Sequence, residues 1–140
     1  MKFMMLVLPP SYTSILPDTM PGAEAVAQMA KYNQELADAG VLLGLNGLHP
    51  PSMGARVTFP EGKPKVQDGP FAEAKEVLGG YWIIDVPSRE DAIAWACKVP
   101  PVEPFTIEVR QVQEVEDFPE DVREALGGFD EAKWSEGQRK

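Results

Sequence analysis

His49 and Asp68 have side chains suited to acid–base chemistry, and each stands where a polar turn follows a strand-like segment. His49 lies in Gly-Leu-His-Pro-Pro after an apolar stretch, and Asp68 lies in Asp-Gly-Pro at the end of a shorter one. An imidazole titrates near neutral pH, and a carboxylate within reach can orient it. Because both residues stand at the ends of expected strands, we predict that they line one cleft. They are the predicted catalytic pair if the protein is an enzyme.

A structural role also explains the same two residues. His49 would then be a hydrogen-bonding loop residue, and Asp68 would cap the turn formed by Gly69 and Pro70. The Ser and Thr residues show no spacing typical of a nucleophilic site. For a binding cleft, the candidate ligand-binding residues are His49, Asp68, Phe71, Tyr32 and Trp82.

The composition argues against several classes of partner. The 140 residues carry 22 acids and 13 bases, a net charge of -9, which repels a phosphate backbone. We therefore predict no nucleic-acid partner. With one His and one Cys, the chain lacks the side chains of a Cys/His zinc site, so we predict no metal and no cofactor. Cys97 lies in an expected helix, where it should pack as a small apolar residue.

The first ten residues are the only candidate for a targeting signal. Their apolar part, residues 3–8, is short and ends in two prolines without a small-residue cleavage site. A first strand explains them better, and no apolar run is long enough to span a membrane. We expect a cytoplasmic protein without a membrane partner.

Hydrophobic patterning predicts the order strand, helix, strand, hairpin, strand, helix, strand. Strands are expected over residues 2–8, 41–48, 81–86 and 105–110, with a hairpin of 55–59 and 65–67. The first helix should carry Ala25, Met29, Tyr32 and Leu36 inward and stop at Gly40. The second should begin at Ser88 as N-cap, with inward Ala92, Trp95, Ala96 and Val99.

Residues 1–112 then form one α+β domain, and residues 113–140 form an acidic C-terminal extension with a short helix. Phe118, Val122 and Leu126 recur at i, i+4 and i+8, so we expect this helix to dock on the domain.

The first strand is apolar on both faces, although two helices can cover only one face of a sheet. Alternate residues place Met4, Leu6 and Leu8 on one side and Phe3, Met5 and Val7 on the other. A large exposed apolar sheet is rare on a monomer, so a second copy related by a twofold axis is the expected cover. We predict a ferredoxin-like βαββαβ fold that forms a dimeric α+β barrel.

Several motifs in order resemble the DGPF-domain type of the YCII-related family: "GLHPPS", "DGPFAEAKE", "LGGYWIIDV", "SREDAIAWA" and "IEVRQV". The resemblance runs from about Met1 to Val112. It implies a ferredoxin-like dimeric barrel with a cleft over the sheet and a His/Asp pair, but no generally established reaction. The family's His lies on the first helix, whereas residues 21–40 contain none, and only Asp38 matches the family's acid there.

The resemblance also implies a regulatory setting, because DGPF-type proteins are often encoded near extracytoplasmic-function sigma factors. The leading prediction is a homodimeric protein that binds an unidentified small molecule. The first alternative is an acid/base enzyme that uses His49 and Asp68 on a small substrate. The second is a protein-interaction module acting through the acidic extension or with a sigma factor, so the sequence leaves enzymatic activity open.

Overall fold

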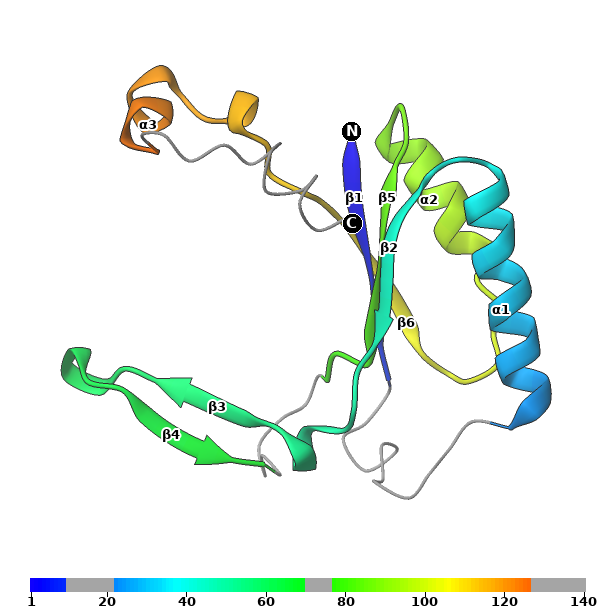
Figure 1. Cartoon of the computed structure of the whole chain (residues 1–140), viewed down its shortest axis with the longest axis horizontal. Coiled ribbons are helices and arrows are strands. Elements are labelled where there is room, and N and C mark those ends of the chain that lie inside the picture. The colour runs from blue at the N-terminus through cyan, green and yellow to red at the C-terminus, as the bar shows by residue number, and fades with distance from the viewer. Residues whose placement is uncertain (10–21, 70–76, 127–140) are drawn as a thin grey trace.

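The computed structural model describes residues 1–9, 22–69 and 77–126. Four strands, β1 (Lys2–Leu8), β2 (Leu42–Gly47), β5 (Gly80–Asp85) and β6 (Thr106–Gln111), form an antiparallel sheet in the order β2-β5-β1-β6. Helices α1 (Ala23–Asp38) and α2 (Arg89–Cys97) lie on the same face of this sheet (Figure 1). The strand order and the single helical layer are consistent with a ferredoxin-like fold and confirm the predicted α+β class, with β1 as a central strand.

A hairpin is inserted between β2 and β5. Its strands β3 (Ala55–Thr58) and β4 (Lys65–Asp68) form a separate two-stranded sheet, as the sequence pattern predicted. At its tip, Glu61 and Gly62 adopt positive φ angles of 55° and 79°, a conformation that glycine takes without strain. Figure 1 shows the hairpin projecting from the sheet on the side opposite the helices.

Local signals set the helix ends where the sequence placed them. Gly40, just after α1, has a φ of +74°, the left-handed conformation in which helices commonly stop. Ser88 is the N-cap of α2, and its Oγ accepts a hydrogen bond from the Asp91 backbone N–H at 3.1 Å. The Ser88 hydroxyl also donates to the Asp91 carboxylate at 2.8 Å, so the two side chains close the first turn together.

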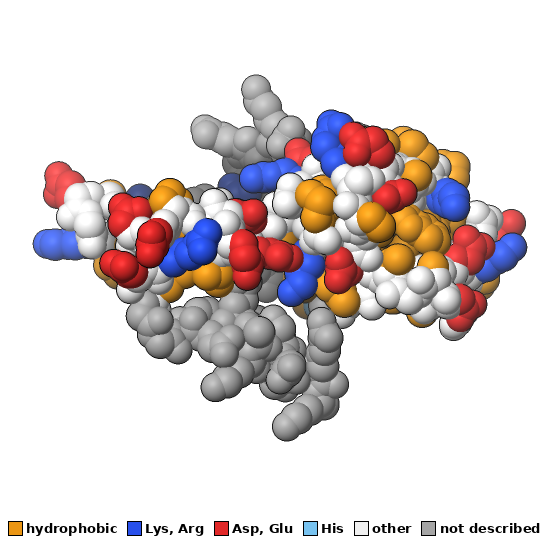
Figure 2. All heavy atoms as spheres, turned by 90° about the horizontal axis from the view of Figure 1, so that it is seen from above, with side chains coloured by type: hydrophobic (Ala, Val, Ile, Leu, Met, Phe, Trp, Pro, Cys, Tyr) orange, Lys and Arg blue, Asp and Glu red, His pale blue; other side chains and the backbone are white. Residues whose placement is uncertain are grey.

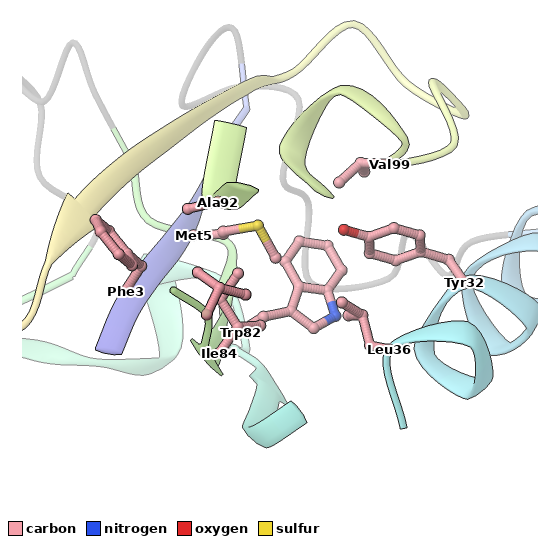
Figure 3. Close-up of a cluster of buried hydrophobic side chains, with 9 residues drawn as sticks. Phe3, Met5, Tyr32, Leu36, Trp82, Ile84, Ala92 and Val99 are labelled. Atoms are coloured by element: carbon pink, nitrogen blue, oxygen red, sulfur yellow. The ribbon is translucent and has the colours of Figure 1, made fainter. Parts of the chain in front are cut away.

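The hydrophobic core lies between the helices and the inner face of the sheet. Its inner-face strand residues alternate with outward ones, as expected for a sheet covered on one side. The buried cluster comprises Phe3, Met5, Tyr32, Leu36, Trp82, Ile84, Val86, Ala92 and Val99 (Figure 3).

No helix of the described residues covers the other face of the sheet. Its centre is a set of partly exposed apolar side chains that we call the open face, namely Met4, Leu6, Tyr81 and Ile83. The strand register pairs Met4 with Ile83 and Leu6 with Tyr81, so these four side chains are neighbours. The cover for this face, a second copy of the chain, remains a prediction.

The segment after β6 contains a short 3₁₀ turn (Val115–Asp117) and helix α3 (Glu120–Ala125). Figure 1 shows α3 standing away from the sheet, on the side of the open face. The side chains of Val122 and Leu126 are 39% and 38% exposed. The docking expected from their spacing is therefore not seen against the residues that the structure describes.

Cys97 is exposed, which corrects the expectation that it packs as a small apolar residue. It is the last residue of α2, and the inner face of that helix is made by Ala92 and Ala96. At 100° per residue, position 97 points about 140° away from Ala92, toward solvent.

In the described ranges, no helix is long and apolar enough to cross a membrane.

The pair Gly47 and Gly80, opposite each other in the β2–β5 register, gives a matched test of packing at one end of the sheet. A Cβ on Gly80 would lie 2.9 Å from the Asn46 carbonyl oxygen, whereas a Cβ on Gly47 would meet no atom within 4 Å. We expect Gly80→Ala to lower the free energy of unfolding by about 1–3 kcal/mol and Gly47→Ala to change it by less than about 0.5 kcal/mol. Urea denaturation measures both, and equal effects would contradict the close approach at Gly80.

Candidate functional site

A cavity of about 230 Å³ lies between α1 and one end of the sheet, where β1 and β2 end and β5 begins. Its apolar wall is formed by Val7, Met29, Leu45 and Trp82. The register pairs Gly47 with Gly80 beside the paired Leu45 and Trp82. Because neither glycine has a side chain, this end of the inner face is not filled, which leaves room for the cavity.

Asn33 supplies the cavity with an oriented polar group. Its Oδ1 accepts a hydrogen bond of 2.7 Å from the Trp82 indole N–H. An indole nitrogen can only donate, so the atom facing it must be the Asn33 carbonyl oxygen, and the amide orientation is fixed. The Asn33 NH₂ group has no acceptor among the described residues, and it is a hydrogen-bond donor at the wall of an apolar cavity.

Asn46 and Tyr81 also line the cavity, at the sheet edge. The Asn46 Nδ2 donates to the Tyr81 hydroxyl oxygen at 2.9 Å, which leaves that hydroxyl able to donate in turn. Tyr81 belongs to the open face as well, so the cavity wall and the open face share this residue.

Tyr32 holds the helix layer together beside the cavity. Its hydroxyl donates to the Trp95 carbonyl oxygen at 2.7 Å, and its ring meets Trp82 edge-on, with centroids 5.5 Å apart. Figure 3 shows the Trp82 ring reaching from β5 toward Tyr32 and Leu36 of α1. Burial raises the pKa of the Tyr32 phenol, and the Glu35 carboxylate raises it further, so this hydroxyl stays protonated.

The model of the YCII-related domain matches residues 1–116. The chain belongs to the YCII-related family. An uncharacterized protein of Rhizobium meliloti (strain 1021) is 32% identical over 78 residues. That match covers 56% of this chain and 63% of the relative's own length, so the chain spans less than two thirds of the relative.

In this YCII-related chain, the predicted acid–base pair lies at the base of the hairpin. His49 follows β2 and Asp68 ends β4, and both side chains are exposed. The hairpin base is closed by a 2.9 Å hydrogen bond from the Gly69 N–H to the Gly54 carbonyl oxygen. Gly69 must be glycine here, because a Cβ would overlap the Pro51 carbonyl oxygen.

No hydrogen bond or ion pair joins His49 to Asp68 among the residues that the structure describes, and neither is among those lining the cavity. Their common cleft remains a prediction. Asp38 accepts a 2.8 Å hydrogen bond from Gln34 on the surface of α1. Phe71 lies outside the described residues.

Of the predicted ligand-binding residues, Trp82 lines the cavity and Tyr32 stands behind it in the core. The sequence reasoning missed Asn33, Met29 and Leu45. One signal was present for Asn33. It lies four residues after Met29, so it follows a side chain of the predicted inward face while being polar itself.

We expect Tyr32→Phe to lower the free energy of unfolding by about 1 kcal/mol at pH 7, because the hydrogen bond to Trp95 is lost.

The raised pKa of Tyr32 makes a second prediction. Above about pH 10, the ordinary pKa of tyrosine, the unfolded phenol ionises while the folded one stays neutral, so the wild type loses stability. Urea unfolding between pH 8 and about pH 11 measures this effect. The difference in the free energy of unfolding between wild type and Tyr32→Phe should become smaller as the pH rises. A gap that widens with pH would contradict this assignment.

Proposed function

We propose that this YCII-related protein binds a small, neutral and largely apolar molecule in the cavity between α1 and the sheet, and that it does so as a homodimer. The observation that carries the proposal is the Asn33 NH₂ group, which is oriented by Trp82 and finds no acceptor among the described residues at an apolar wall. Ligand sites typically combine such a wall with a few placed polar groups.

The cavity restricts the size and charge of the molecule. Its volume of about 230 Å³ is below the usual range for drug-sized ligands, which suits a molecule of about ten non-hydrogen atoms. None of the described lining residues is Lys, Arg, Asp or Glu, so an ionised ligand would lose its hydration without gaining a counter-charge. A carbonyl oxygen is the acceptor that best matches the Asn33 donor.

The residues that line the cavity favour ligand binding over catalysis. His49 and Asp68 do not line the cavity, and the only titratable lining residue among those described is Tyr81. The acid/base enzyme and the interaction module remain predictions from the sequence, and so do the DGPF subtype and the regulatory link to sigma factors.

Acetophenone and ethylbenzene test the ligand chemistry, because both present a small aromatic body and only acetophenone has a carbonyl acceptor. We expect acetophenone to bind in the millimolar range and about fivefold more tightly than ethylbenzene, the value of one hydrogen bond. Titration followed by the Trp82 indole N–H resonance, assigned with Trp82→Phe, measures both affinities.

Two variants sharpen this test. Asn33→Asp keeps an oxygen for the Trp82 indole and removes the NH₂ donor, so the preference for acetophenone should disappear. Leu45→Trp should block the cavity, whereas Leu48→Trp should not, since Leu48 does not line it. These leucines are 38% and 46% exposed, so both substitutions are tolerable for folding. Binding that survives Leu45→Trp would refute the proposed site.

The homodimer is supported by the pattern of the sheet's uncovered face. Across from the apolar Met4 and Leu6, β6 presents Arg110 and Glu108, whose side chains form a 3.8 Å ion pair. An apolar centre with a polar rim is the usual anatomy of a protein interface. We therefore assign the open face as the contact between two copies related by a twofold axis.

We expect Ile83→Asp to convert the dimer to a monomer at micromolar concentration, because it would bury two carboxylates at a symmetric contact. Val26→Asp, on the exposed surface of α1, is the control and should remain a dimer. Light scattering with size-exclusion chromatography distinguishes the two outcomes. A wild-type chain that is already monomeric at this concentration would exclude the proposed dimer.

A further inference from the structure

The hairpin, which we call the arm (residues 55–68), is not covered by the described part of the chain. Every residue of β3 and β4 is exposed. Val57 and Val66 are paired across the two strands, yet they are 50% and 65% exposed. An isolated two-stranded hairpin is marginally stable in water, so the apolar pair needs another surface.

The segment after β6, which we call the extension (residues 114–126), also exposes apolar side chains, but its net charge is negative. Val122 and Leu126, one helical turn apart, are partly exposed. The extension contains six acids and one Arg, and Figure 2 shows acidic side chains gathered over the part of the molecule that carries α3.

The arm, in contrast, carries a net charge of +1 in an acidic chain. It contains three bases and two acids, in a protein whose net charge is -9. Lys63 and Lys65, near its tip, are exposed. The acidic extension and the arm are therefore complementary in charge, and each presents apolar side chains that lack cover.

Within one chain the arm and the extension lie at opposite ends of the sheet. Figure 1 shows both projecting on the side of the open face, the arm beyond one end of the sheet and the extension beyond the other. A second copy placed on the open face, with the twofold axis perpendicular to the strands, brings its arm to the end of the sheet where the first chain has its extension. Twofold symmetry would then repeat any contact between them.

We infer that the arm of each copy docks on the extension of the other, with Val57 and Val66 against Val122 and Leu126, and with Lys63 and Lys65 beside the acids of α3. This inference rests on the proposed homodimer. It makes the arm and the extension, which both lie outside the βαββαβ core, a second contact between copies.

Cross-linking between two differently tagged, co-expressed chains tests the contact. Both chains carry Cys97→Ser; one adds Val66→Cys and the other adds Val122→Cys. Oxidation should join the two different chains on a non-reducing gel, because the contact runs from arm to extension. Val26→Cys in place of Val122→Cys is the control and should give no such product, since Val26 lies on the outer surface of α1.

Charge exchange provides the second test. The double change Lys63→Glu with Lys65→Glu should weaken dimerisation about tenfold, the effect of losing a few exposed ion pairs. Adding Glu120→Lys with Asp121→Lys to the same chain should restore the affinity, measured by sedimentation at several concentrations. Loss without restoration would overturn the arm–extension contact.

Light scattering on the wild type separates the two levels of the proposal. A dimer without the cross-link between different chains, or without restoration, overturns the inference and leaves the open-face dimer standing. A monomer at micromolar concentration overturns both.

Discussion

The contact between Trp82 and α1 sets the spacing between the sheet and its helical layer. The indole N–H donates a hydrogen bond of 2.7 Å to Asn33, and the ring packs edge-on against Tyr32, the residue that precedes Asn33 on α1. An aromatic side chain held at both its polar and its apolar parts allows little freedom of position. Since Met29 lies one turn before Asn33 on α1, this contact also fixes the cavity wall. A molecule bound there would touch the side chain that holds the fold, so its binding would stabilise the folded state.

Glycines, which have no side chain, shape one end of the cavity and the base of the hairpin. Gly80 faces Gly47 across the β2–β5 pair, and a Cβ at Gly80 would collide with the Asn46 carbonyl oxygen. The close backbone approach requires glycine, and the same missing side chains leave the inner face unfilled beyond Trp82. Of the two glycines, only Gly80 is required by the packing of β2 on β5, and both line the cavity. At the hairpin base, Gly69 likewise allows the arm to lie against the turn that contains Pro51.

The two faces of the sheet differ in how far their apolar side chains are buried. On the inner face, Phe3, Met5 and Ile84 are almost fully buried by the chain's own helices. On the open face, Met4, Leu6 and Ile83 are only partly covered, and both the arm and α3 project on that side. The chain's own helices close the core on the inner side, whereas the other side presents apolar surface of the kind that second copies cover.

The sequence by itself determined the elements, the α+β class and the central position of β1, because hydrophobic periodicity, Gly40 and the Ser88 cap are local signals. It also identified Trp82, one wall of the cavity. It did not reveal the cavity, because Met29, Asn33, Leu45 and Gly80 come from three elements and meet only when α1 packs on the sheet. It placed Cys97 in a helix but not on the correct side, since that depends on which face α2 turns inward. Local order is encoded over a few residues, whereas a site is a set of distances between distant residues, and only tertiary packing fixes those distances.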